Sequence, residues 1–99
     1  MKIAIASDND SINSLVSDKG GRAPFYLVFE NSKMIESLKN PFATGGGGAG
    51  FSVAYMLADK GIEKLYASEL GKNMLNALAE RGVAYEKVEL GKRISDIID

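Results

Sequence analysis

The segment from Phe25 to Glu30 reads FYLVFE, and its nearly unbroken apolar character constrains the fold more than any other feature of the sequence. A strand with one face in water alternates apolar and polar residues, whereas an unbroken run is typical of a strand covered on both faces. Asn31 and Ser32 then have the length and composition of a tight turn, and Lys33 to Leu38 predicts a second, antiparallel strand. The chain must therefore bury a sheet between other layers of structure.

The rest of the chain alternates strand-like and helix-like segments, after a mostly loop-like stretch over residues 7 to 22. Apolar runs predict strands at Lys2 to Ala6, Ile62 to Ser68 and Val83 to Leu90, and helical spacing predicts helices at Phe51 to Lys60, Met74 to Arg81 and after Gly91. The order is three strands, then helix, strand, helix, strand and helix. A meander followed by parallel crossovers predicts an α/β fold with one mixed sheet and helices packed on it.

Two details of the predicted helices can be tested by the structure. Gly61 and Gly82 are expected to end the first two helices in the left-handed conformation, which glycine adopts without strain. In the second helix, Leu75, Leu78 and Ala79 share one face at helical spacing. We therefore expect this face to be buried.

Length and composition limit the possible functions. A chain of 99 residues has room for one hydrophobic core, so we expect a single domain over residues 1–99. A formal net charge of -1 gives no basic surface for nucleic acid or an anionic membrane. The apolar part of the N-terminus, MKIAIASD, is too short for a signal peptide and meets an acidic residue too early, and no apolar run approaches the ~18 residues of a membrane span. We expect a cytoplasmic protein without nucleic-acid or membrane partners.

The chain contains no cysteine and no histidine. The commonest protein ligands of iron, zinc and copper are therefore missing, and we predict no metal-ligating residues. The serines have no histidine to act as a base, so no catalytic residues are predicted either. Any ligand must be held by backbone amides, hydroxyls, carboxylates, lysine or arginine.

A run of glycines precedes the first predicted helix. Gly45 to Gly50 reads GGGGAG and leads directly into the apolar spacing that begins at Phe51. The start of a helix presents unpaired N–H groups and the positive end of the helix dipole. This junction therefore predicts a binding site for an anion or a bulky acidic cofactor.

Several short motifs together resemble one known family. They are KIAIASD at the N-terminus, Ser17 to Tyr26 (SDKGGRAPFY), Asn40-Pro41, Gly48-Ala49-Gly50 at the head of a helix, and Leu57 to Gly61 (LADKG). Over nearly the whole chain they resemble the dinitrogenase iron-molybdenum cofactor biosynthesis family, which includes NifX-like proteins and the C-terminal domain of NifB. The resemblance implies a ribonuclease H-like three-layer fold whose five-stranded mixed sheet has the order 3-2-1-4-5. The segment order read from the sequence agrees with it.

The resemblance also implies a non-enzymatic binding protein related to carriers of a nitrogenase cofactor. Its pocket would lie between residues 7 to 22, the Gly45 to Gly50 loop and the turn from Glu69 to Asn73. The ligand would be the iron-molybdenum cofactor, its iron–sulfur precursor or another small anion, bound without histidine or cysteine ligands. The candidate cofactor-binding residues are Lys19, Arg22, Gly47, Gly48, Gly50, Ser52, Glu69, Gly71 and Asn73.

Two positions depart from the pattern of that family. Members often carry SPHFGR before the second strand, but here Lys19 stands at the histidine position and Gly20 replaces the aromatic residue. Members also often show Gly-Gly-x-Gly after the fourth strand, where this chain has Ser68-Glu69-Leu70-Gly71. A protonated lysine pairs with an acidic cofactor but does not coordinate its iron.

Two other functions remain open. A protein-interaction domain with a lapsed ligand site, which would need a protein partner, fits Lys19 and the missing histidine. A nucleotide-binding module fits Gly45-x-Gly47-x-x-Gly50, which matches the dinucleotide fingerprint, and Glu69 follows at the distance expected of a ribose-binding acid.

Overall fold

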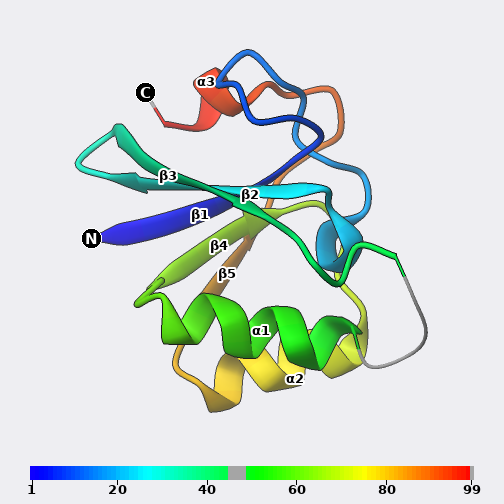
Figure 1. Ribbon diagram of the computed structural model, residues 1–99. Helices are drawn as coiled ribbons and strands as arrows, with labels where there is room; N and C mark the ends of the chain where they lie inside the picture. Colours follow the sequence, from blue (N-terminus) through cyan, green and yellow to red (C-terminus); the bar gives the residue numbers. More distant parts are fainter. Residues whose placement is uncertain (45–48, 99) are drawn as a thin grey trace.

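The computed structural model describes residues 1–44 and 49–98 (Figure 1). In chain order its elements are β1 Lys2–Ser7, the 3-10 helix η1 Gly20–Arg22, β2 Phe25–Glu30, β3 Lys33–Lys39, α1 Ala49–Asp59, β4 Lys64–Ala67, α2 Lys72–Glu80, β5 Ala84–Lys87 and α3 Ile94–Ile97. Within the described residues the strands form one five-stranded sheet in the order β3-β2-β1-β4-β5. This confirms the predicted α/β class and strand order. None of the described helices is long and apolar enough to cross a membrane.

The directions of the strands determine where their loops meet. β1 pairs antiparallel with β2, and β2 pairs antiparallel with β3. On its other side β1 pairs parallel with β4, which pairs parallel with β5. The carboxyl ends of β1, β4 and β5 therefore lie at one edge of the sheet, on the right in Figure 1. Ligands of α/β proteins commonly bind at this kind of edge.

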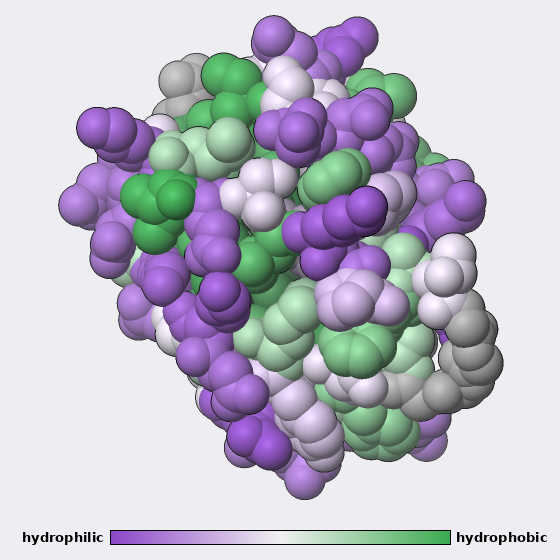
Figure 2. Space-filling view, viewed as in Figure 1, coloured by the Kyte–Doolittle hydropathy of each residue, from purple (hydrophilic) through white to green (hydrophobic). Residues whose placement is uncertain are grey.

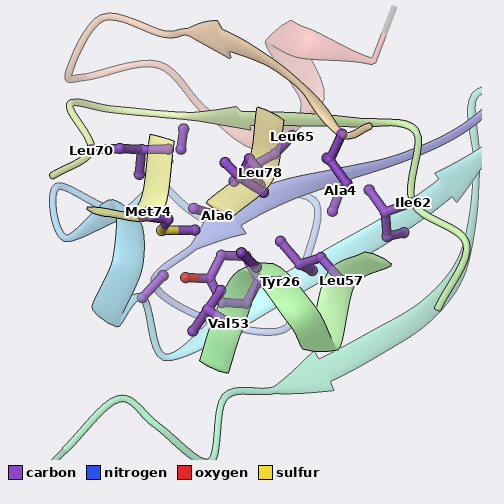
Figure 3. Packing of buried hydrophobic residues seen from close by; sticks show 14 of the residues in the cluster. Ala4, Ala6, Tyr26, Val53, Leu57, Ile62, Leu65, Leu70, Met74 and Leu78 are labelled. Carbon is purple, nitrogen blue, oxygen red and sulfur yellow. The ribbon is translucent and has the colours of Figure 1, made fainter. Parts of the chain in front are cut away.

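Helices cover both faces of the sheet, with α1 and α2 on one side and α3 on the other (Figure 1). Tyr26 and Val28 of β2 belong to the cluster on the α1 and α2 side, as Figure 3 shows for Tyr26. Leu27 and Phe29 belong to the opposite cluster, together with Ile94 of α3. All four β2 side chains are at most 1% exposed. The prediction from the unbroken apolar run is therefore confirmed.

The first two helices end as predicted, but the strands after them start later than predicted. Gly61 and Gly82 have φ values of 78° and 75°. The N–H groups of the next residues, Ile62 and Val83, bond to helix carbonyl oxygens five residues earlier, at 3.1 and 2.9 Å. This is the Schellman arrangement, in which the residue after the glycine still closes the helix. Ile62 and Val83 therefore belong to helix ends, and β4 and β5 begin after them.

The prediction for the buried face of α2 is confirmed for Leu78 but wrong for Leu75 and Ala79. Leu75 is 37% exposed and Ala79 is exposed, whereas Met74, Ala77 and Leu78 are at most 2% exposed. Both sets follow the i, i+3, i+4 rule, so spacing alone could not choose between them. The contact that orients the helix comes from α1, whose first turn packs on Met74.

Residues 7 to 22 carry more structure than a plain loop. The N–H of Val16 bonds to the carbonyl oxygen of Lys92 at 2.9 Å, and the N–H of Ser17 bonds to that of Ala6 at 2.9 Å. Val16 and Ser17 are 3% and 0% exposed. The segment folds back along β1 and carries η1 to the edge where β1 and β4 end.

Candidate functional site

A pocket of about 520 Å³ opens at this edge of the sheet. Residues 18–22 around η1, residues 49–50 at the start of α1 and residues from 69 to 74 at the start of α2 line it. In Figure 1 these segments meet at the right-hand ends of α1 and α2. The pocket brings together these predicted binding residues: Lys19, Arg22, Gly50, Glu69, Gly71 and Asn73.

The wall formed by η1 depends on close packing at Gly20. A Cβ atom at this position would overlap the Leu70 side chain and would lie 3.1 Å from the carbonyl oxygen of Glu69. The hydroxyl of Tyr26 donates a 2.5 Å hydrogen bond to the carbonyl oxygen of Gly20, and burial raises the pKa of this hydroxyl. Glycine at position 20 therefore lets η1 pack closely against the connection between β4 and α2. Lys19 and Arg22, the basic residues on either side of Gly20, then lie along the pocket.

The starts of α1 and α2 lie together because of Gly50. A Cβ atom on Gly50 would lie 2.9 Å from the Cβ of Met74, closer than such atoms come in proteins. Met74 is 2% exposed, and its sulfur also packs near Gly21, 3.1 Å from where a Cβ would be. Gly50 thus has a packing role that sequence reasoning did not foresee. It brings two helix N-termini to one pocket.

The start of α2 is open by comparison. Gly71 is the N-cap residue with φ -69° and ψ 158°, and among the described residues no side chain caps the helix. No described heavy atom outside its chain neighbours lies within 4 Å of a Cβ built at Gly71. The first N–H groups of a helix have no partner within the helix and carry partial positive charge. Lys72 and Asn73, in this first turn, line the pocket.

Charged side chains of both signs surround the pocket: Lys19, Arg22 and Lys72 are cationic, and Asp18 and Glu69 are anionic. In the described part of the chain, ion pairs join Lys60 with Glu36 and Lys64 with Glu86, so the two lysines of the pocket belong to neither. The cations outnumber the acids, and two helix N-termini add partial positive charge. The described lining therefore carries one more positive than negative side chain.

Three predicted residues do not join this group. Ser52 lines a separate hollow of about 540 Å³ on the outer face of α1. It follows Gly50 by two residues, which turns it by roughly 200° around the helix axis, away from the pocket. Gly47 and Gly48 lie outside the described residues.

Asp18 and Lys72 lie in segments that were expected to border the pocket, but sequence reasoning did not name them as binding residues. Each adjoins a residue that was predicted, namely Lys19 and Gly71. The signal for Lys72 was its place in the first turn of a helix whose N-terminus was already expected to face the ligand. For Asp18 the sequence gives no comparable signal, because loop residues follow no period.

The donors of the pocket limit what it can hold. They are ammonium, guanidinium and amide N–H groups, and the chain has neither histidine nor cysteine. Within the described residues no group of three acidic, histidine or cysteine side chains could hold a metal ion. These residues fit an acidic metal cluster that is bound at its surface by charged side chains and hydrogen bonds. They do not fit direct coordination of its metal atoms by nitrogen or thiolate ligands.

The chain belongs to the dinitrogenase iron-molybdenum cofactor family, whose model matches residues 1–99. The apo form of the orange protein from Desulfovibrio gigas is similar in structure, with a TM-score of 0.91 and 25% identity over 98% of this chain and 82% of that one. A DUF35-family protein from Thermotoga, named as a candidate NifB protein, has a TM-score of 0.80 and 30% identity over 96% and 81%. No curated protein matches the sequence.

These comparisons confirm the family resemblance and the fold. They support a small protein related to a metal cofactor. The question left for the pocket is which ligand it takes and how.

Proposed function

We propose that this protein is a non-enzymatic binding protein that carries an acidic metal cluster or another small anion in the pocket between η1, α1 and α2. The observation that supports this is the convergence of two helix N-termini with Lys19, Arg22 and Lys72 on one pocket. The family description points to the iron-molybdenum cofactor, or its iron–sulfur precursor, as cargo.

The cargo would be held by contacts outside its metal coordination shell. A hydrogen bond from a cationic side chain to an anion contributes ~1.5–3 kcal/mol, and a helix N-terminus adds ~0.3–1 kcal/mol. The cationic side chains reach an open pocket, so salt should weaken the binding. A ligand held in this way leaves without breaking a metal–protein bond, which suits a carrier.

The pocket is poorly equipped for catalysis. The described residues that line it include no histidine, cysteine or serine, the groups that most often act as base or nucleophile. A carrier needs neither. The proposal therefore assigns binding, and no reaction, to these residues.

One observation favours a second candidate, a protein-interaction domain. The hollow on the outer face of α1 is lined partly by Phe42, Tyr55 and Met56. Phe51 and Tyr55 on the same helix are 38% and 41% exposed. Figure 2 shows apolar and weakly polar residues gathered on the face that α1 occupies in Figure 1, bordered by hydrophilic ones. Such a surface suits a partner protein.

The topology favours a nucleotide less. The dinucleotide fingerprint needs its glycines after a strand of a parallel βαβ unit. Here the glycine run follows β3, which pairs antiparallel at the edge of the sheet. Glu69 does line the same pocket as Gly50. In the described sheet, however, the strand before the glycines is the antiparallel β3, and not a strand of a parallel βαβ unit.

The test is anaerobic titration with isolated iron-molybdenum cofactor, followed by amide NMR shifts. We expect shifts at residues 19–22 and 71–74. Replacing Arg22 by alanine should weaken binding about tenfold to a hundredfold, which corresponds to ~1.5–3 kcal/mol. Lys33→Ala is the matched control, since this exposed lysine starts β3 and does not line the pocket. The proposal fails if the cofactor leaves these amide shifts unchanged. It also fails if Arg22→Ala binds the cofactor as tightly as the wild type and Lys33→Ala do.

A further inference from the structure

One side of the backbone of β3 has no neighbouring strand in the described sheet. β3 stands at the end of the strand order, and among the described strands it pairs only with β2. Of its seven residues, Glu36 is half-buried, Leu38 is buried and the others are exposed. The outer side of an edge strand presents N–H and C=O groups that can pair with a further strand. β3 therefore offers a template for an extended segment of chain.

The regular part of this edge lies next to α1. The pairing of β3 with β2 leaves out Ile35 and is continuous from Glu36 to Lys39. The Nζ atom of Lys60, directly after α1, lies 3.0 Å from a carboxylate oxygen of Glu36. In Figure 1, α1 lies below β3 accordingly. A segment added outside the regular part of β3 would therefore run along α1.

The hollow on the outer face of α1 continues this edge. Pro41 and Phe42, which follow β3, form one side of it. The side-chain amide of Asn40 donates a 2.9 Å hydrogen bond to the carbonyl oxygen of Ala23, and its oxygen accepts a 2.9 Å bond from the N–H of Phe42. Asn40 is 5% exposed. This wall is thus fixed before any partner binds, which lowers the entropic cost of binding.

The charges along the edge favour an acidic segment over a second copy of this chain. Lys33 and Lys39 lie at its two ends, and neither belongs to an ion pair of the described residues. Antiparallel pairing of two β3 strands about Glu36 would place Lys33 opposite Lys39 and Glu36 opposite its own copy. Like charges directly opposite each other destabilise a strand pair, and opposite charges stabilise it. The charges of Asp59 and Lys60, which both line the hollow, cancel each other.

We propose that the edge of β3 and the hollow beside it bind an extended segment of a partner protein in which acidic and apolar residues alternate. The segment adds a strand to β3. Its apolar side chains enter the hollow among Phe42, Tyr55 and Met56, and its acidic side chains, on the other face, lie near Lys39. In this mode of recognition the main-chain hydrogen bonds provide affinity, and pockets for alternate side chains provide specificity.

This inference rests on the second candidate function, the protein-interaction domain, and names its partner and binding mode. It is also compatible with the carrier function. The first turn of α1 lines the anion pocket, so a partner docked along the same helix lies close to the ligand.

Synthetic peptides of the length of β3 are the probes. The acidic peptide alternates glutamate and valine, the basic peptide alternates lysine and valine, and the methylated peptide is the acidic one with every backbone nitrogen methylated. We expect the wild-type protein to bind the acidic peptide about tenfold more tightly than the basic one. The methylated peptide, which has no backbone donors, should bind about tenfold more weakly than the acidic one. Amide NMR shifts should appear from Glu36 to Lys39 and at Phe42.

Two pairs of variants test the two parts of the surface. Lys39→Glu should weaken binding of the acidic peptide about three- to tenfold. Lys87→Glu is its matched control, because it makes the same charge change on β5 at the opposite edge of the described sheet. Tyr55→Ala should weaken binding about three- to tenfold. Leu75→Ala is the control for it, because Leu75 is 37% exposed, compared with 41% for Tyr55, and does not line the hollow.

Several results would overturn the inference. They are no binding of the acidic peptide, equal affinities for the acidic and basic peptides, undiminished binding of the methylated peptide, or equal effects of each variant and its control. A dimer of the free protein in sedimentation, with β3 at its interface, would assign the surface to a second copy. A helical peptide that shifts the amides of α1 alone would leave an interaction domain but exclude strand addition.

The cofactor titration separates this inference from the carrier function. If the isolated cofactor binds and the acidic peptide does not, the carrier function stands and the inference fails. If the peptide binds as expected but the cofactor leaves residues 19–22 unshifted, the docking surface stands and the carrier function fails.

Discussion

The starts of α1 and α2 meet at the same pocket, and each carries a glycine, but the two glycines are placed very differently. A Cβ atom on Gly50 would press on the Cβ of Met74 at 2.9 Å, whereas a Cβ on Gly71 would meet no described heavy atom beyond its neighbours within 4 Å. Gly50 allows α1 to pack closely against α2, whereas Gly71 leaves the N-terminus of α2 open. A glycine beside a ligand pocket is therefore not in itself evidence of contact with the ligand.

The strongest test of this contrast is Gly50→Ala. The new methyl group meets the Met74 side chain near its backbone, which cannot rotate away, and overpacking of this kind costs about 1–3 kcal/mol. The better helix propensity of alanine offsets less than about 1 kcal/mol of this. We expect a lower urea midpoint with an unchanged slope. A variant as stable as the wild type would show that α1 and α2 pack less closely than described.

Tyr26→Phe tests the other packed part of the wall, the hydrogen bond that fixes η1. Loss of this bond should cost about 0.5–1.5 kcal/mol at neutral pH.

The effect of Tyr26→Phe on stability should depend on pH. Burial raises the pKa of Tyr26 above its ordinary value of 10.0, so the unfolded phenol ionises at a pH where the folded one keeps its proton. The stability that this difference provides is complete below pH 10 and is lost above it, by about 1.4 kcal/mol per pH unit. The difference in the free energy of unfolding between wild type and Tyr26→Phe should therefore decrease above pH 10. If the free energies of unfolding of the two proteins changed with pH in parallel, the hydroxyl of Tyr26 would not be buried.

Much of the fold could be predicted from the sequence because its signals are local. The apolar run at Phe25 to Glu30 and the turn after it define the antiparallel part of the sheet, and Gly61 and Gly82 end their helices as predicted. The buried face of α2 could not be chosen in this way. It depends on the contact between Gly50 and Met74, which are 24 positions apart in the sequence, as their numbers show.

The pocket was only partly predictable for the same reason. Family motifs pointed to Lys19 and Arg22, which line it. Ser52 lies on another side of α1 because two residues beyond Gly50 the helix has turned by roughly 200°. The packing of Gly20 against Leu70 joins two distant loops, and no periodic pattern in either loop reports it.

The smallest expected change in stability comes from Gly71→Ser, and it gives the sharpest test of the open helix start. Serine is compatible with φ -69° and ψ 158°, and its hydroxyl can accept a hydrogen bond from a first-turn N–H. Stability should rise by a few tenths of a kcal/mol. Phosphate affinity, measured by calorimetry, should fall roughly three- to tenfold because the hydroxyl occupies a donor that the anion would use. Gly71→Ala is the control, since it adds bulk without a cap. Equal losses in both variants would assign the effect to space, and a more stable serine variant with unchanged affinity would place the anion away from the N-terminus of α2.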